Sequence, residues 1–234
     1  MSDFSEDPIL RGLVRVVQPR RGYRFSLDAL LLADFAGRVC ASRILDLGCG
    51  SGVIALVLGA RRPDARVVGL EIQPELCEAA RRGAAINGLA DRVAVLEGDI
   101  REGERFLPAG SFDLVVCNPP FFAPGRGRPS PDGGRALARH ALTCDLPDVF
   151  RAARHALRPR GHVAIIYPTP RVPEIQGLHL RALRAVVPRD GRPPRRHLIE
   201  LGPARRGGPE VLSPLVVHEG AGYTKELREL LGDA

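Results

Sequence analysis

Short apolar runs alternate along the chain with longer segments that carry helical periodicity. The apolar runs are rich in β-branched residues and are bounded by turn residues, which predicts strands. The predicted strands are Arg43–Leu47, Arg66–Glu71, Val93–Glu97, Phe112–Cys117 and His162–Tyr167. The predicted helices between them are Gly52–Gly59, Pro74–Asn87 and Asp145–Leu157. This alternation predicts a parallel sheet, and runs such as DLVVC and VAIIY, apolar on both faces, indicate strands that helices cover on each side.

The pattern changes at both ends of the chain. Near the N-terminus we expect a hairpin around Gln18–Arg21, followed by a helix that Ser26 caps. The two hairpin strands would be Leu13–Val17 and Gly22–Phe25, and the helix would be Leu27–Phe35. After Pro168 the pattern predicts a helix around Val172–Arg184. The last predicted strands, expected to finish the same sheet at its edge, are Ala185–Pro188, Arg195–Leu201 and Pro214–His218.

Composition indicates one compact soluble domain. Of the 234 residues, 44% are hydrophobic and 26% are charged, and no apolar run is long enough to span a membrane. The N-terminus is acidic and lacks the apolar segment of a secretory signal, and the five cysteines include no Cys-x-x-Cys pair. We therefore expect a cytoplasmic protein with no membrane partner, no disulfide framework and no metal site. Residues 1–234 are expected to form a single domain, with 1–38 as a hairpin and helix cap and 39–234 as the core.

The net charge of +7 favours a polyanionic partner, because basic residues gain affinity for phosphates by releasing counterions. Lys225 is the only lysine among the 34 basic residues, a bias that a GC-rich coding sequence could also produce. Aromatic residues make up 5% of the chain and Trp is absent, which argues against a protein that reads unpaired bases on a wide stacking platform.

The segment LDLGCGSG, from Leu45 to Gly52, lies between a predicted strand and a predicted helix. Its glycines allow a sharp turn and a close approach of a ligand to the helix N-terminus, where backbone N–H groups are unpaired. A dinucleotide fingerprint would have Gly or Ala where Val53 stands, and the Gly-Lys-Ser/Thr of a triphosphate loop is absent. The loop therefore predicts a ligand site that is neither of these two.

Acidic residues lie at the carboxyl ends of the next two predicted strands. Glu71 ends the strand VVGLE, where a carboxylate can accept hydrogen bonds from both hydroxyls of a ribose, and Asp99 follows the third strand. In an open parallel sheet these strand ends converge on the crevice above the carboxyl edge, where ligands bind. Three such strand ends predict a binding site more strongly than a glycine loop alone.

The tetrapeptide Asn118-Pro119-Pro120-Phe121 follows the apolar strand FDLVVC directly. Two prolines fix φ and remove N–H donors, so the Asn118 side chain and the Pro119 carbonyl can be held as acceptors facing a common point. A planar NH₂ group fits that point, and Phe121 could stack on the ring that bears it. Pro, Gly, Ser and Arg in Ala123–Gly134 predict a loop after this motif.

These four elements resemble the Rossmann-like, S-adenosylmethionine-dependent class I methyltransferases, and Asn-Pro-Pro-Phe is similar to the motif of members that methylate exocyclic or amide nitrogens. The implied fold is a doubly wound, mostly parallel sheet of seven strands with an antiparallel edge. Further elements look like the bacterial tRNA1(Val) adenine(37)-N6 methyltransferases, which modify the adenosine beside the anticodon. These elements are Val16–Ala36, Ala138–His140, RPPRRHLIEL (Arg192–Leu201) and Gly222–Thr224. The chain departs from that family in the Gly/Pro/Arg enrichment of 123–134 and in its near-total lack of Lys.

The resemblance implies a role for each motif. S-adenosylmethionine is the implied cofactor, with Asp46 near its amino group, Glu71 at its ribose, and Asp99 with the Ile100 N–H at its adenine. The implied cofactor-binding residues are Gln18, Asp28, Asp46, Gly48, Cys49, Gly50, Gly52, Glu71, Ile72, Asp99, Ile100 and Asn118. The implied catalytic residues, which would hold the adenine N6, are Asn118, Pro119, Pro120 and Phe121. The arginines expected around the mouth of the site, where RNA would bind, are Arg20, Arg21, Arg126, Arg128, Arg139, Arg195 and Arg196.

Other functions stay open at the level of the sequence. The Asn-Pro-Pro-aromatic element also serves methyltransferases for guanine N2 of ribosomal RNA and for glutamine N5 of proteins, and a non-catalytic RNA-binding protein could retain the fold. The leading interpretation is methyl transfer to the N6 of an adenine in RNA, expected to be tRNA near the anticodon. A monomer is the expected form, although the sequence does not determine the oligomeric state.

Overall fold

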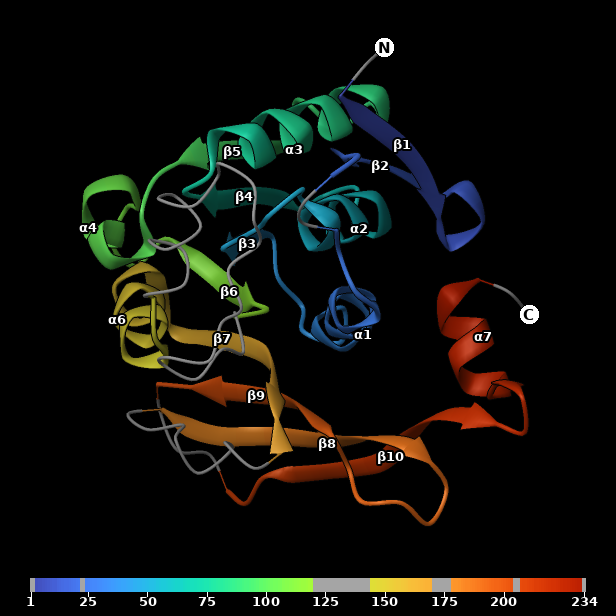
Figure 1. Cartoon of the computed structure of the whole chain (residues 1–234). Helices are drawn as coiled ribbons and strands as arrows, with labels where there is room; N and C mark the ends of the chain where they lie inside the picture. Colours follow the sequence, from blue (N-terminus) through green and yellow to red (C-terminus); the bar gives the residue numbers. More distant parts are fainter. Residues whose placement is uncertain (1–2, 22–23, 120–143, 170–177, 204–206, 233–234) are drawn as a thin grey trace.

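A computed structural model describes residues 3–21, 24–119, 144–169, 178–203 and 207–232. Within these residues, nine strands form one sheet in the order β11-β10-β8-β9-β7-β6-β3-β4-β5, with helices on both sides (Figure 1). The strands are β3 (Arg43–Leu47), β4 (Arg66–Glu71), β5 (Val93–Glu97), β6 (Phe112–Cys117), β7 (Leu157–Pro168), β8 (His179–Arg189), β9 (Arg196–Gly202), β10 (Glu210–Glu219) and β11 (Gly222–Tyr223). The α/β class predicted from the sequence is confirmed.

Helices pack on both faces of the sheet, and each face has its own hydrophobic core. They are α1 (Leu27–Ala36), α2 (Val53–Arg61), α3 (Pro74–Ile86), α4 (Gly103–Phe106), α6 (Leu146–Ala156) and α7 (Lys225–Leu231). One hydrophobic core joins α1 and α2 to the sheet through buried residues such as Leu31 and Leu56, and a second core joins α6 to the other face through Phe150. Among the described residues, no helix is both long and apolar enough to cross a membrane.

The central helices follow their predicted bounds closely because their ends carry local signals. Pro74 stands in the first turn of α3, and Asp145 caps α6 by accepting a hydrogen bond from the N–H of Asp148 at 3.1 Å. Burial of the apolar side chains then holds each helix on the sheet. The strands β7 and β10 extend beyond the predicted His162–Tyr167 and Pro214–His218.

The predicted helix Val172–Arg184 is wrong where the structure describes it, because β8 begins at His179. Ala, Leu and Arg in HLRALR favour a helix by propensity, but β8 pairs with β9 on one side and with β10 on the other. The antiparallel strand β9 lies inside the sheet, between β7 and β8, rather than at its edge as predicted. The short antiparallel β11 forms that edge, and the described part of the chain contributes nine strands to the sheet where seven were predicted.

The N-terminal hairpin exists and the predicted strand Leu13–Val17 matches β2 (Val14–Pro19), but the turn is not at Gln18–Arg21 and the partner strand precedes β2 instead of following it. The strand β1 (Phe4–Ile9) pairs antiparallel with β2, and the 3-10 turn η1 (Leu10–Gly12) connects them. The segment FSEDPI contains no apolar run, so its sequence does not predict a strand. It forms β1 because it pairs with β2. Asn87 fixes the hairpin on α3, because its Oδ1 accepts from Arg15 N at 2.8 Å and its Nδ2 donates to Arg15 O at 2.7 Å. Ser26 holds the N-cap position of α1 without the predicted side-chain hydrogen bond.

Candidate functional site

Four strand ends that carry the predicted motifs lie side by side. The order β6-β3-β4-β5 is uninterrupted, and all these strands are parallel. Leu47 at the end of β3 pairs with Cys117 of β6 and with Leu70 of β4, so the strands end at nearly the same level. The residues that follow them therefore meet at one carboxyl edge, as the sequence predicted.

The glycine loop adopts the conformation that its sequence predicts. Gly48, Gly50 and Gly52 have φ values of 68°, 56° and 79°, a region that L side chains rarely adopt. A Cβ at Gly52 would also lie 2.9 Å from the Cβ of Ala80 on α3. The loop is fixed to the neighbouring strand by the N–H of Gly48, which donates to Leu70 O at 2.8 Å. Glycine is therefore needed at position 52 for both backbone conformation and helix packing.

Glu71 is 5% exposed and holds the glycine loop through its carboxylate. Its Oε2 accepts a hydrogen bond from Gly50 N at 2.9 Å, and its Oε1 accepts one from Gln73 N at 2.9 Å. Each carboxylate oxygen can accept more than one hydrogen bond, so these contacts leave capacity for a ligand's hydroxyl groups. Glu71 can thus hold the glycine loop and bind a ribose at the same time.

Asp46 is buried at 1% exposure, and neither of its carboxylate oxygens has a hydrogen-bond partner among the described residues. Burial raises its pKa to about 7; the Ala55 amide in the first turn of α2 opposes this increase, and the negative charge of Glu71 adds to it. The hydroxyl of Ser51 in the same glycine loop is also buried, and no described residue forms a hydrogen bond with it. Buried polar groups are normally satisfied, so these atoms indicate a place where a ligand with donor groups fits.

Asn118 extends the same edge at the end of β6. Its side chain is half-buried, and its Oδ1 is buried with no hydrogen-bond partner among the described residues. Pro119 is buried next to it, whereas Pro120 and Phe121 lie outside the described residues. The structure therefore presents a buried acceptor at the position where the sequence predicted one.

Comparisons with known proteins agree with this site. A family model described as a methyltransferase domain matches residues 40–187. A tRNA1(Val) (adenine(37)-N6)-methyltransferase from Porphyromonas gingivalis is 35% identical over 215 residues, covering 86% of this chain and 83% of the relative. One of the same name from Aeromonas hydrophila is 36% identical over 190 residues, covering 78% of each chain. This chain belongs to the tRNA1(Val) (adenine(37)-N6)-methyltransferase family.

Solved structures show the same architecture. A predicted O-methyltransferase from Agrobacterium tumefaciens is 27% identical with a TM-score of 0.68, covering 88% of this chain and 97% of that one. TrmN from Thermus thermophilus is 25% identical with a TM-score of 0.54, covering 74% and 47%. The methyltransferase assignment makes S-adenosylmethionine the cofactor, as the sequence predicted.

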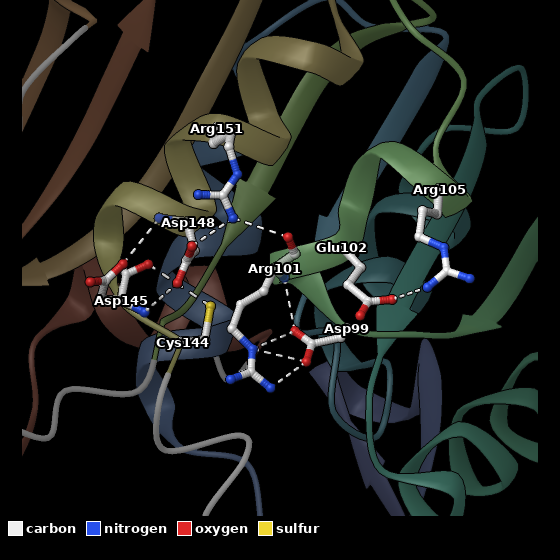
Figure 2. Close-up of polar contacts among 8 residues, drawn as sticks. All are labelled: Asp99, Arg101, Glu102, Arg105, Cys144, Asp145, Asp148 and Arg151. Carbon is white, nitrogen blue, oxygen red and sulfur yellow. Dashed lines mark hydrogen bonds and ion pairs between the residues drawn. The ribbon is translucent and has the colours of Figure 1, made fainter.

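Asp99, expected to read the cofactor's adenine in this methyltransferase family, is engaged by Arg101 (Figure 2). Asp99 Oδ1 accepts from Arg101 N at 2.8 Å, and Oδ2 accepts from Arg101 Nη2 at 2.5 Å. Asp99 also precedes the 3-10 turn η2 (Ile100–Glu102), and a Cβ at Gly48 would lie 3.5 Å from Ile100 Cδ1. The Asp99 segment therefore borders the glycine loop, but the carboxylate is bound by a partner that sequence analysis missed.

Two other predicted cofactor residues have protein partners. Gln18 is buried, its Nε2 donates to Asp7 Oδ2 at 2.7 Å, and its Oε1 accepts from Phe25 N at 3.4 Å. Asp28 in the first turn of α1 accepts from Arg196 Nε at 3.2 Å. These contacts join the hairpin, α1 and β9, and a role at the cofactor stays a prediction for both residues.

The predicted RNA-binding arginines of this methyltransferase differ in exposure, and three of the seven lie outside the described residues. Arg20, Arg21 and Arg195 are exposed, and the half-buried Arg196 is the partner of Asp28. The arginines that lie outside the described residues are Arg126, Arg128 and Arg139.

Sequence analysis missed two polar residues at the site. Ser51 lies inside the glycine motif, and its hydroxyl could have been noted as the loop's own side-chain donor. Gln73 supports Glu71 through its backbone N–H, for which no side-chain pattern gives a signal. Two further residues predicted to bind the cofactor are Ile72 and Cys49. Ile72 directly follows Glu71 and is half-buried. Cys49 is buried against β4, where a Cβ at Gly69 would lie 2.6 Å from its Sγ.

Proposed function

We propose that this chain transfers a methyl group from S-adenosylmethionine to the exocyclic N6 of an adenine in tRNA, near the anticodon. The observation that carries the proposal is the buried Oδ1 of Asn118, which has no hydrogen-bond partner among the described residues and lies beside the strand ends that suit the cofactor. An acceptor that is buried without a partner costs free energy, so its retention favours a ligand donor at that point. The exocyclic NH₂ of adenine is such a donor. Membership of the adenine-N6 family supports the same substrate.

The residues present fit the cofactor. The buried carboxylate of Asp46 suits a cationic amino group, and Glu71 can accept from ribose hydroxyls while it holds Gly50. The turned glycine loop leaves room for a close approach of a ligand to α2. When bound, S-adenosylmethionine supplies an electrophilic methyl group on a sulfonium.

The chain's own contribution is positioning rather than acid–base chemistry. Asn118 Oδ1 and the Pro119 carbonyl would accept hydrogen bonds from the adenine NH₂, which favours a more tetrahedral and more nucleophilic nitrogen and aligns it for in-line attack. The proton can leave after transfer, so no general base is needed before attack. Burial raises the pKa values of the Cys49 and Cys117 thiols well above their usual range, so neither supplies a thiolate nucleophile.

A nucleoside assay tests this function directly. Purified protein is incubated with S-adenosylmethionine and total bacterial tRNA, and the digested nucleosides are analysed by mass spectrometry. We expect new N6-methyladenosine with the wild type and none with Asn118→Ala. Calorimetry with S-adenosylhomocysteine should give nearly equal affinities for both proteins, because Asn118 acts on the acceptor. Methylated guanosine without N6-methyladenosine, or no newly methylated nucleoside at all, would contradict the proposal.

A further inference from the structure

Two adjoining grooves lie at the ends of β8 and β10, apart from the cofactor site. The first encloses about 480 Å³ and is lined in part by Arg189, Arg192, Arg195 and His218. The second encloses about 420 Å³ and shares Arg189 and His218 with the first. We call the two together the β8–β10 groove. The segments Arg192–Leu201 and Gly222–Thr224, which resemble the tRNA methyltransferase family, contribute residues at or beside it.

The β8–β10 groove opens at the same edge of the sheet as Asn118. The strands β6 and β7 are parallel, β9 is antiparallel to both β7 and β8, and β10 is parallel to β8, so the carboxyl ends of β6, β8 and β10 point the same way. Three strand spacings, about 15 Å, separate β6 from β8 across the sheet. The register places Leu183 of β8 level with Cys117, so Arg189 lies six residues, about 20 Å, further along the strand direction. One RNA molecule can therefore contact both places.

A row of three side chains crosses the neighbouring strands at the groove. Arg189 of β8 pairs with His218 of β10, and His218 pairs with Tyr223 of β11. The rings of His218 and Tyr223 are 5.2 Å apart between centroids, and Tyr223 is 41% exposed. Arg189 Nη1 donates to Gly220 O at 2.5 Å, which holds the β10–β11 turn beside β8. The row therefore places a guanidinium next to the half-buried ring of His218 and the exposed ring of Tyr223, an arrangement on which a base can stack.

The two halves of the groove differ in charge. Arg192 and Arg195 are exposed on the first half, and neither side chain forms an ion pair with a described residue. Asp190 and Glu219 line the second half, and Asp190 Oδ1 accepts from Gly191 N at 3.0 Å within the turn. An anionic group is thus favoured in the first half and disfavoured in the second, where a neutral ring with donor groups fits.

We propose that the β8–β10 groove binds one nucleotide of the substrate RNA other than the methylated one. Its phosphate lies between Arg192 and Arg195, which can each donate two parallel hydrogen bonds to phosphate oxygens, and its base lies on the His218–Tyr223 ring pair. The inference rests on the proposed methyl transfer to tRNA and adds a second anchor for the same substrate. Such an anchor raises affinity for RNA without entering the methyl-transfer step.

The proposed phosphate contact of Arg192 and Arg195 is tested by fluorescence anisotropy of the full chain with a labelled tRNA1(Val) transcript at several salt concentrations. We expect the double variant Arg192→Ala/Arg195→Ala to raise Kd about tenfold and to reduce the slope of log affinity against log salt by about one to two. The control Arg154→Ala/Arg160→Ala removes the same charge from exposed positions near the amino end of β7 and should retain the wild-type slope. Equal losses in both double variants would overturn the site.

The proposed stacking of the base on the His218–Tyr223 ring pair is tested with Tyr223→Ala and Tyr223→Phe. We expect Tyr223→Ala to raise Kd several-fold and Tyr223→Phe to bind as the wild type does, since the ring provides the contact. At saturating tRNA, turnover of the groove variants should stay within twofold of wild type while KM rises. If the wild type methylates tRNA and all groove variants bind as it does, the groove proposal fails and the proposed function stands. If the wild type neither binds nor methylates tRNA, the proposed function fails as well.

Discussion

At the residue scale, the buried carboxyl of Asp46 makes cofactor binding depend on pH. Its pKa of about 7 means that much of the folded, unliganded protein carries a proton there below pH 7. A bound ammonium group favours the ionised carboxylate, so binding must release this proton. The affinity for the cofactor is therefore expected to rise with pH until the carboxyl is ionised.

We predict that affinity for S-adenosylhomocysteine falls by up to about tenfold for each pH unit below 7 and is nearly constant between pH 7.5 and 8.5. Calorimetry in buffers of different ionisation enthalpy measures both the affinity and the released proton. Asp46→Asn should bind weakly with no proton release. Equal wild-type affinities at pH 5.5 and 7.5 would show that Asp46 does not contact the amino group.

Glu71 provides a second prediction at this scale, because its carboxylate accepts from Gly50 N and would also accept from the ribose. Glu71→Gln keeps the shape but removes the charge, and hydrogen bonds to charged groups contribute about 1.5–3 kcal/mol. We expect roughly ten- to hundredfold weaker binding of S-adenosylhomocysteine by calorimetry. The matched control is Glu75→Gln, an exposed residue on α3 that loses the same charge. Similar affinities for the two variants would refute the role of Glu71.

At the element scale, local capping signals explain why some boundaries were predictable. Asp145 and Asp148 form a capping box at the start of α6, with Asp148 Oδ2 accepting from Asp145 N at 3.4 Å. The signal is contained in four consecutive residues, so the sequence reveals it. The strand β8 has no such local signal, and its pairing partners come from β9 and β10, which follow it in the chain.

The cap of α6 leads to a stability prediction. Asp145→Ala should lower the free energy of unfolding by about 1 kcal/mol, because the first turn of α6 loses a side-chain acceptor. Asp145→Asn retains an acceptor oxygen and should cost much less. Urea denaturation followed by circular dichroism measures both variants. The capping role would be disproved by equal losses in the alanine and asparagine variants.

At the scale of the whole molecule, several carboxylates connect distant segments. Asp113 on β6 accepts from Arg43 N at 2.9 Å on β3 and from Arg158 Nη1 at 2.5 Å on β7. Burial opposes its ionisation, but these hydrogen bonds and those from Ser42 outweigh burial and lower its pKa. The hydrogen bond from His162 likewise lowers the pKa of Glu200, which joins β7 to β9.

These lowered pKa values predict how global stability depends on pH. The unfolded chain binds more protons at these groups than the folded chain, so their contribution is present above about pH 4 and is lost as pH falls below it. Asp113→Asn should lower Tm at pH 7 and flatten the loss of Tm between pH 5 and pH 3. Asp64→Asn, at an exposed position, should follow the wild-type curve. Thermal melts across this pH range test the prediction, and identical curves for the two variants would contradict it.

The sequence by itself determined the parallel α/β core, the glycine loop and the positions of Asp46, Glu71, Asp99 and Asn118 at one sheet edge. It could do so because strand periodicity, capping and glycine conformation are local, and because parallel strands place their carboxyl ends together. The family follows from the same motifs and is supported by the relatives. The division into 1–38 and 39–234 within one domain stays a prediction.

The tertiary structure alone decided the first strand of the hairpin, the interior place of β9 and the contacts of the polar side chains. Pairing overrides propensity in HLRALR and in FSEDPI, because the hydrogen bonds come from strands elsewhere in the chain. Packing decides whether a carboxylate is held by an arginine, as Asp99 is, or has no hydrogen-bond partner in the described part of the chain, as is the case for Asp46. The β8–β10 groove also exists only in three dimensions, since strands from separate segments bring its arginines and rings together.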